Sequence, residues 1–169
     1  MVEVYEVGGK GGLGLAKDLE NASGAIAIGI QEAFDGIDWK PFLGNQVIPA
    51  MQQMESEYFE SETDPNGTAW PELAQSTIDA KGHDTILVET NKLKSSLIGE
   101  TGDSVKEVVQ EGKNAGATWG TSVEYARFHQ AKDGRLPQRA MVGLSERNVD
   151  ALTESTGGEA VRQLVESGK

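Results

Sequence analysis

Apolar residues follow two different periods along the chain, and the shorter period predicts β-strands. Residues 2–7 (Val-Glu-Val-Tyr-Glu-Val) nearly alternate between apolar and polar, and residues 25–30 carry an isoleucine at every second position. Successive side chains of a strand point to opposite faces, so both runs are typical of strands. The second strand could pair with the first across the glycine-rich segment 8–14.

The longer period, of three and four residues, begins near residue 41 and continues to about residue 60. Its apolar positions are Val47, Met51, Met54 and Tyr58, and glutamate and glutamine fill the other face. This spacing predicts the longest helix of the chain, with its apolar stripe packed on the core or on a neighbouring subunit. Pro49 lies near a helix start or causes a kink, because proline has no N–H to donate.

Shorter signals follow between residues 64 and 97. Asp64-Pro65-Asn66-Gly67 predicts a turn, because proline presets its own φ and Asn-Gly tolerates a left-handed backbone. Residues 76–81 predict a short helix that ends at Gly82. Leu93 and Leu97 stand one helical turn apart and indicate another short helix.

The clearest hairpin signal lies between residues 104 and 123. Residues 104–111 and 116–123 are rich in β-forming residues and are joined by Gly112-Lys113-Asn114-Ala115. The second run contains Trp119, whose ring we expect to lie buried against the long helix.

Three helical signals close the chain. Residues 125–130 predict a compact helical turn, and Ser145 is a candidate N-cap for a helix that starts beside it. After Gly157-Gly158 the sequence predicts a separate, weakly amphipathic tail helix that a partner could hold. The apolar positions of this tail are Val161, Leu164 and Val165.

Length and composition limit the class of protein. A chain of 169 residues builds one ordinary domain with a modest core. No apolar stretch approaches the roughly 20 residues of a membrane span, and residues 1–6 lack the basic start and apolar run of a signal peptide. We therefore expect a protein that stays where it is made. The absence of cysteine excludes disulfides, thiolate catalysis and cysteine zinc sites.

The formal net charge of -12 bears on whether the chain can bind nucleic acid. Proteins that wrap nucleic acid bind its phosphates through clustered Lys and Arg, which release counterions. An acidic chain repels the phosphates instead. The negative charge therefore argues against this binding mode. A role in solubility alone is enough to explain the charge.

Candidate chemistry is sparse. The glycine-rich segment 8–14 resembles a phosphate loop, yet Lys10 is not followed by Ser or Thr, and a flexible connector is the simpler interpretation. Asp64, Asn66 and Asp79 do not follow the alternate positions of a calcium loop. We expect no cofactor and no metal.

His129 shares a helical face with Tyr125 and is the one candidate for acid–base chemistry. The only other histidine, His83, lies 46 positions away, which makes a weak zinc case, and neither histidine has a carboxylate or nucleophile signature beside it. A packing or hydrogen-bonding histidine is the favoured interpretation. A small acid–base hydrolase and a free monomeric binding module remain as alternatives.

Four stretches of the chain, taken in order, resemble a known family. The first is Phe59-Glu60-Ser61-Glu62-Thr63-Asp64-Pro65-Asn66-Gly67-Thr68-Ala69-Trp70-Pro71-Glu72-Leu73 with Thr77, similar to the family's helix end, turn and "Gly-x-x-Trp-x-x-Leu…Thr". The second is Ile86-Leu87 with Thr90-Asn91-Lys92-Leu93 and Ser96-Leu97, similar to "Ile-Leu…Thr-Gly-x-Leu…Ser-Ile". The other two are Tyr125-Ala126-Arg127-Phe128-His129-Gln130 and Pro137-Gln138-Arg139-Ala140-Met141-Val142-Gly143-Leu144-Ser145, similar to "Tyr-Ala-x-x-His-Gln" and "Pro-x-Arg-x-Phe-x-Gly-Leu-Ser".

In this order and spacing the stretches resemble the phage virion morphogenesis family, the tail-completion proteins of Mu-like and related contractile-tailed phages. The match runs from about Met54 to Leu152. It departs from the family at Asn91, where Gly is usual and where Asn can keep a left-handed backbone. It departs again at Met141, where a flexible side chain replaces an aromatic one, and in the loop of residues 131–135.

The resemblance implies an α+β fold: an antiparallel β-sheet packed against a long α-helix with short flanking helices. Residues 1–40 would form an N-terminal extension with strands and a Gly-rich loop, residues 41–155 the tail-completion-like α+β domain, and residues 156–169 a helical tail. The subunit would assemble as a homo-oligomeric ring, with a hexamer expected, and its work would be complementarity between interfaces rather than catalysis.

The resemblance also implies a place in the virion and a set of partners. The ring would cap the tail tube at the phage neck, after synthesis in the host bacterial cytoplasm, and would contact the tail tube or sheath protein and the head–tail connector proteins. A head-closure protein of the same neck is the alternative. DNA would be a passing occupant of the lumen, and carboxylates facing the lumen would let it slide.

The motif positions are the candidate site residues, and none is assigned to catalysis. Arg139 could pair with a carboxylate of its own or of an adjacent subunit, and Trp70 is a core residue or an interface anchor, with the core favoured. The set is Asp64, Pro65, Gly67, Trp70, Leu73, Thr77, Leu87, Leu93, Tyr125, Ala126, His129, Arg139, Gly143 and Leu144. The candidate interface residues are Val47, Met51, Met54, Tyr58 and Arg139.

Overall fold

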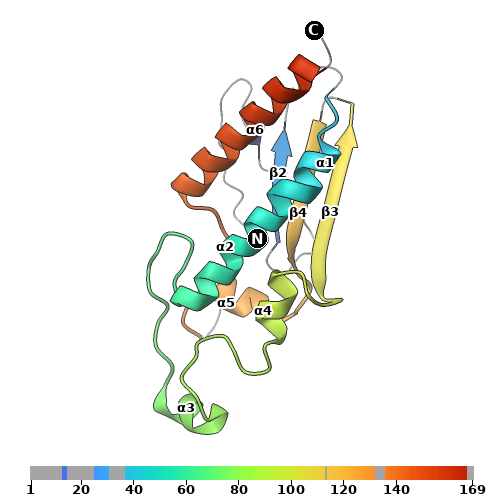
Figure 1. The fold of residues 1–169 in the computed structure, drawn as a ribbon. Helices are drawn as coiled ribbons and strands as arrows, with labels where there is room; N and C mark the ends of the chain where they lie inside the picture. Colours follow the sequence, from blue (N-terminus) through green and yellow to red (C-terminus); the bar gives the residue numbers. More distant parts are fainter. Residues whose placement is uncertain (1–12, 15–24, 31–36, 113, 132–135, 167–169) are drawn as a thin grey trace.

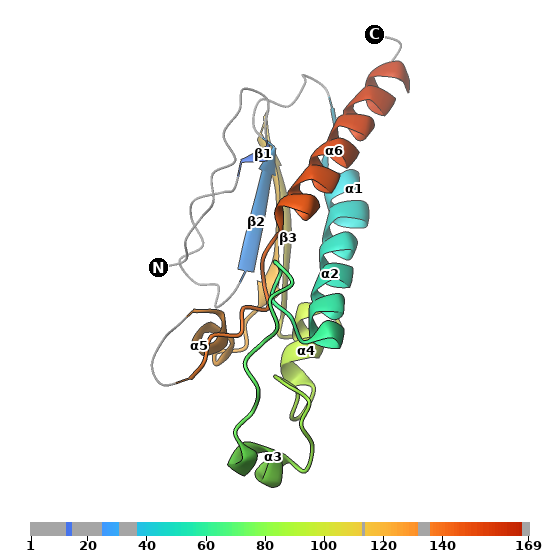
Figure 2. The same ribbon diagram turned by 90° about the vertical axis from the view of Figure 1, so that its left-hand side faces the viewer.

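Strands and helices form separate layers in the computed structural model of the chain (Figures 1 and 2). The structure describes residues 13–14, 25–30, 37–112, 114–131 and 136–166. The strand predicted at residues 2–7 lies outside the described residues, as does most of the glycine-rich segment 8–14. The α+β class that the sequence predicted is confirmed, with an antiparallel sheet packed against a long helix.

The sheet has four strands in the order β1-β2-β4-β3, and every pairing is antiparallel. The strands are β1 (Leu13–Gly14), β2 (Ala25–Ile30), β3 (Ser104–Glu111) and β4 (Asn114–Thr121). The strand expected at residues 25–30 is therefore present. It pairs with β4 along its whole length, so the sheet extends across the domain boundary expected at residue 40.

The β3–β4 hairpin is tighter than the sequence analysis predicted. β4 begins at Asn114 rather than at residue 116, and Ala115, expected in the loop, pairs with Gln110. Only two residues, 112 and 113, separate the strands. Gly112 has φ +59, the left-handed conformation that two-residue hairpin loops require and that matches the twist of the strands.

The predicted long helix is confirmed, and it contains a wider turn. α1 (Lys40–Phe42) continues into the π-helical segment η1 (Leu43–Val47) and then into α2 (Ile48–Ser61). Pro49 is the second residue of α2, two positions after the end of η1. Its ring cannot be accommodated in a regular helix, where it meets the carbonyl of residue i−4 and removes an N–H donor, so the widened turn precedes it.

The apolar stripe of this helix packs inside the subunit. Val47 and Met51 lie in a cluster with Trp119 of β4, and all three side chains are buried. Tyr58 is buried further along, and Met54 is partly buried between two clusters. These four candidate interface residues therefore face the core of their own chain, which decides between the two predicted positions of the stripe.

Three short helices lie at the other end of the molecule. They are α3 (Gln75–Lys81), α4 (Lys92–Leu97) and α5 (Ala126–Gln130), as the sequence predicted within one or two residues. α3 ends at Gly82, which has φ +78, and Asn91 precedes α4 with φ +60. Asn91 thus keeps the left-handed backbone expected where the family usually has glycine.

The C-terminal part of the chain differs most from the prediction. One helix, α6 (Glu146–Glu166), runs through Gly157-Gly158 without a break, so no separate tail begins at residue 156. Its start is capped as predicted, because Ser145 Oγ accepts the N–H of Asn148 at 3.3 Å. Leu152 and Ala160 of α6 are buried in the core of the same subunit.

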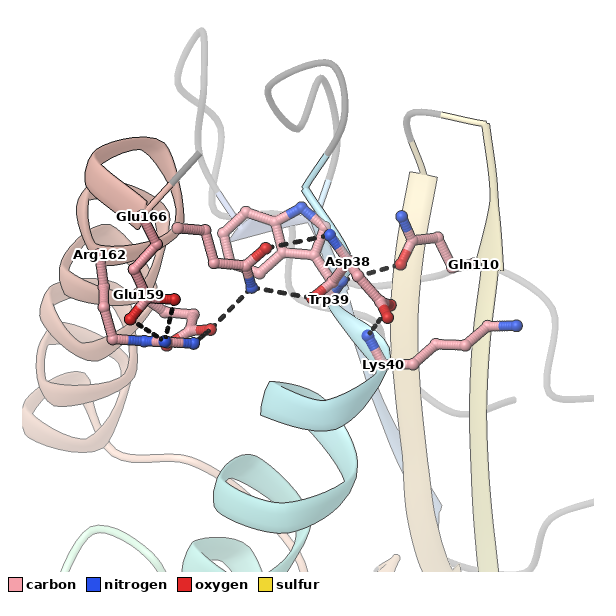
Figure 3. A network of polar contacts seen from close by, with 8 residues as sticks. Asp38, Trp39, Lys40, Gln110, Glu159, Arg162 and Glu166 are labelled. Atoms are coloured by element: carbon pink, nitrogen blue, oxygen red, sulfur yellow. Dashed lines mark hydrogen bonds and ion pairs between the residues drawn. The ribbon is translucent and has the colours of Figure 1, made fainter. Parts of the chain in front are cut away.

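Side-chain amides fasten α6 and the sheet to the start of the long helix (Figure 3). Gln163 of α6 donates to the carbonyl of Asp38 at 2.9 Å and accepts its N–H at 3.1 Å. From the sheet, Gln110 accepts the N–H of Trp39 at 2.9 Å and donates to the carbonyl of Ile37 at 2.9 Å. Each amide thus replaces a pair of backbone hydrogen bonds.

One of the buried residues of α2 is an acid. Glu55 of α2 is fully buried, and neither carboxyl oxygen has a hydrogen-bond partner within the described part of the chain. Burial raises the pKa of Glu55 well above its ordinary value of 4.5, and the neighbouring Trp119 indole lowers that pKa only in part. Glu55 is therefore an uncharged acid in the folded protein at mildly acidic pH.

Replacing this acid tests the pKa argument. Between pH 4.5 and the raised pKa of Glu55, the folded state holds one more proton than the unfolded state. The free energy of unfolding therefore falls as pH rises, by up to about 1.4 kcal/mol per pH unit. Urea unfolding at several pH values should show this fall, and Glu55→Gln should remove it and be more stable at neutral pH. Glu57→Gln, exposed on the same helix, is the matched control, and an unchanged pH profile in Glu55→Gln would contradict the argument.

Candidate functional site

The motif residues meet at the end of α2, where a second hydrophobic cluster forms; its buried members are Tyr58, Phe59, Trp70, Ile86, Leu93, Leu97, Val123, Ala126, Met141 and Val142. Trp70 is buried there and packs its ring edge-on against Phe59, with ring centroids 5.4 Å apart. Its indole Nε1 donates to the carbonyl of Ala140 at 2.9 Å. Trp70 is thus a core residue that ties the loop after α2 to residues 137–143, which we call the arginine loop.

Arg139 lies at the centre of the arginine loop and is buried. Its Nε donates to the carbonyl of Pro71 at 2.9 Å, and its Nη2 donates to the carbonyl of Glu72 at 3.0 Å. Burial lowers the pKa of Arg139 from its ordinary value. The carboxylate partner predicted for this guanidinium is not found among the described residues; backbone carbonyls take its place.

Gln130, the last residue of α5, holds the other side of the arginine loop. Its Oε1 accepts the N–H groups of Met141 and Val142, each at 3.0 Å, and its Nε2 donates to the carbonyl of Val142 at 2.6 Å. The N–H of Arg139 donates to the carbonyl of His129 at 2.8 Å. None of the described strands pairs with the loop, so these contacts supply hydrogen-bond partners that its backbone needs.

The end of the arginine loop lies tightly against the turn after α2. A Cβ built on Gly143 would lie 2.7 Å from Cγ of Pro65, so no larger residue fits at that position. Tyr58 lies under the same contact, where its hydroxyl accepts from Nδ2 of Asn148 at 2.8 Å. Burial, with the nearby charge of Glu55 as the next cause, raises the pKa of Tyr58 to about 12, so the phenol stays protonated.

The turn after α2 is held by two carboxylates. Asp64 accepts the N–H groups of Asn66 and Thr68 at 2.9 and 2.8 Å, and Gly67 completes the turn with φ +81. Glu62, at φ +51, ends α2, and its Oε1 accepts the N–H of Ile86 at 2.6 Å. The hydrogen bond from Ile86 thereby joins the end of α2 to the segment around residue 86.

His129 is half-buried beside this site. Burial, with the charge of Arg139 as the second cause, lowers the pKa of His129, so the imidazole is neutral at neutral pH. Its Nδ1 is buried without a hydrogen-bond partner in the described part of the chain. Within that part, no group of three or more His, Cys, Asp or Glu residues is arranged to hold a metal ion.

The predicted site residues do not all meet. Those that join the second cluster or its hydrogen bonds are Pro65, Trp70, Leu73, Leu87, Leu93, Ala126, Arg139 and Gly143. Leu87 does so with φ +57, an uncommon conformation for this residue type. Thr77 lies exposed on α3, Tyr125 is 44% exposed, and Leu144 packs against the cluster around Trp119 instead.

Three residues that the sequence analysis did not select carry much of the site: Glu62, Gln130 and Asn148. Gln130 ends the quoted "Tyr-Ala-x-x-His-Gln" stretch, so its place in the motif was a usable signal. Glu62 lies in the first quoted stretch, so the same signal was available for it, whereas Asn148 gave none, because a polar residue near a helix end resembles any solvated one.

The fold and the site together define a structural class: an α+β protein whose buried polar side chains bind its own backbone. A model of the phage virion morphogenesis family matches residues 42–159, and the chain belongs to this family. The match covers all four motif stretches and extends beyond the range expected from them. Comparisons with curated proteins and with solved structures gave no match. None of the described helices has the length and apolar character needed to cross a bilayer.

Truncating Trp70 tests its structural role. Trp70→Ala removes a buried ring and should lower the free energy of unfolding by about 3–5 kcal/mol. Trp70→Phe keeps a ring against Phe59 but leaves the Ala140 carbonyl without its donor, which should cost about 1–3 kcal/mol. Urea unfolding measures both, and equal stability of Trp70→Ala and the wild type would show that the ring is not buried.

Adding one carbon at Gly143 tests the contact with Pro65. Gly143→Ala should lower the free energy of unfolding by about 1–3 kcal/mol, because the new methyl group displaces the proline ring. Gly102→Ala, where the added carbon meets no atom within 4 Å, is the control and should change little. Similar melting temperatures for the two variants would argue against the close approach.

Proposed function

We propose that the chain is a tail-completion subunit that forms a homo-oligomeric ring, caps the tail tube and joins the tail to the head connector. Membership of the phage virion morphogenesis family over residues 42–159 carries this proposal. The family gives the general role, assembly of a phage virion. The finer assignment to the neck is the proposal.

The construction of the site supports a structural role. Trp70, Gln130 and Arg139 use their donors on the chain's own carbonyls, at distances of 2.6–3.0 Å. Residues used in this way fix the shape of a surface, and a fixed surface is what a ring subunit offers to its neighbours. The proposed neighbours are further copies in a hexamer, the tail tube or sheath protein, and the connector proteins.

The charge of the chain fits the proposed passage of DNA. The net charge is -12, and the carboxylates of Glu57 and Glu60 lie on exposed positions of α2. Carboxylates that face a lumen repel phosphates, so DNA would pass without being held. This is part of the proposal, and a neutral or basic lumen would remove it.

Disrupting the gene in the phage that encodes it tests the proposal. Without a cap, tube growth does not stop, so we expect overlong tails that are separate from filled heads. Complementation with the wild-type chain should restore tail length and joining, and Trp70→Ala should restore neither. Electron microscopy with measured tail lengths reads the result. Tails of normal length beside heads that lose DNA would instead assign the chain to head closure, and intact infectious particles would exclude both roles.

A further inference from the structure

The chain contains one asparagine that is followed by glycine, Asn66-Gly67. The side-chain amide of asparagine is thermolabile, and a following glycine, which has no side chain, lets its backbone nitrogen approach that amide closely. Both residues lie exposed in the turn after α2. The reaction that such a pair allows is intramolecular and needs only water.

This reaction is the loss of ammonia from the side chain of Asn66. The backbone N–H of Gly67 gives its proton to solvent, and the nitrogen forms a bond to Cγ of Asn66. The bond from Cγ to Nδ2 breaks, and the leaving nitrogen takes up a proton and departs as ammonia. Water then opens the cyclic imide. Opening at Cγ gives aspartate, and opening at the main-chain carbonyl gives isoaspartate, whose backbone is one carbon longer.

The folded turn holds the nitrogen that would attack. The N–H of Gly67 donates to the carbonyl of Asp64 at 2.9 Å, and the N–H of Asp64 donates to the carbonyl of Thr68 at 2.8 Å. The Asp64 carboxylate accepts the N–H groups of Asn66 and Thr68. Bringing the Gly67 nitrogen onto Cγ of Asn66 requires rotation about the backbone of Asn66, which breaks the bonds of Gly67 and Thr68 to Asp64.

The same turn leads directly to a buried side chain. Thr63 pairs with Ala69 in an antiparallel bridge, and the N–H of Trp70 donates to the carbonyl of Glu62 at 2.8 Å. The turn is thus the end of a small hairpin that brings Trp70 into the second cluster. An isoaspartate at position 66 lengthens the loop between the two sides, so it disturbs the pairing that positions Trp70.

We propose that Asn66-Gly67 is a modification site, that the turn built by Asp64 protects it in the folded protein, and that isoaspartate at position 66 weakens the packing of Trp70. This goes beyond the proposed function and does not rest on it. The modification needs no enzyme, and its rate in the folded chain depends on how often the turn opens locally.

Comparing ammonia loss in folded and unfolded chains tests the protection. The full-length protein is incubated at mildly alkaline pH, with and without guanidinium, and position 66 is followed by peptide mass spectrometry. The unfolded chain should react at least about tenfold faster, because the folded turn has to break at least two hydrogen bonds first.

Substitutions of Asp64 test which group protects the pair. Asp64→Ala removes the acceptor of two N–H groups and should speed ammonia loss from the folded chain roughly tenfold. Asp64→Asn keeps an oxygen acceptor at the same place and is the matched control, with a rate close to that of the wild type.

Two further chains separate local from global opening, and charge from backbone length. Leu152→Ala removes a buried side chain of the other cluster. It should lower the melting temperature and leave the rate at Asn66 unchanged, because only the turn has to open. The isoaspartate form, isolated by chromatography, should melt below the wild type and below Asn66→Asp, which carries the same charge on an ordinary backbone.

Each other outcome overturns the inference or one of its steps. No ammonia loss from the unfolded chain would remove the site. Equal rates in the folded and unfolded chains, or in Asp64→Ala and the wild type, would show that the turn does not protect the pair. A rate that rises as much in Leu152→Ala as in Asp64→Ala would assign the reaction to globally unfolded molecules. An isoaspartate form that melts together with Asn66→Asp would show that the added carbon does not affect Trp70.

Discussion

Backbone polar groups in irregular segments need partners, and the shape of this subunit depends on how the chain supplies them. The arginine loop and the loop after α2 have little strand pairing, so Trp70, Gln130 and Arg139 bind their carbonyls and N–H groups instead. A buried carbonyl without a donor costs about 1–3 kcal/mol. Removing one of these side chains therefore costs more than its own packing. The same solution recurs at the other end, where Gln110 and Gln163 bind the segment before α1.

Regular elements followed closely from local sequence. The period of three and four predicted a helix from residue 41 to about residue 60, and the structure has it over residues 40–61. Gly82 and Asn91 have the left-handed conformations that their positions require. The hairpin was predicted with its second strand two residues late, because propensity alone does not tell a four-residue loop from a two-residue one. α6 was predicted as two pieces because Gly157-Gly158 reads as a stop. Tertiary contacts of Leu152 and Ala160 outweigh that local cost.

The candidate site was predictable in outline only. The motif stretches indicated which segments matter, but the pairing of an arginine with carbonyl oxygens, or of Gly143 with Pro65, depends on distances that no spacing encodes. The sequence pattern of an apolar helical stripe is also the same whether the stripe packs on the sheet of its own chain or on another chain. Val47 and Met51 were candidates for an interface for this reason, whereas the structure places them in the core. The exposed valines of α6, Val161 and Val165, were visible as a weak pattern, and their outward direction was not.

Met54 contacts both hydrophobic clusters, since it lies where α2 passes from the cluster around Trp119 to the one around Trp70. Both clusters therefore pack on the same helix, α2. Opening either cluster removes contacts of Met54 and so weakens the other cluster, and we therefore expect the described part of the molecule to unfold as a single cooperative unit. Two clusters that unfold together would carry a mechanical load as one body across the described part of the chain.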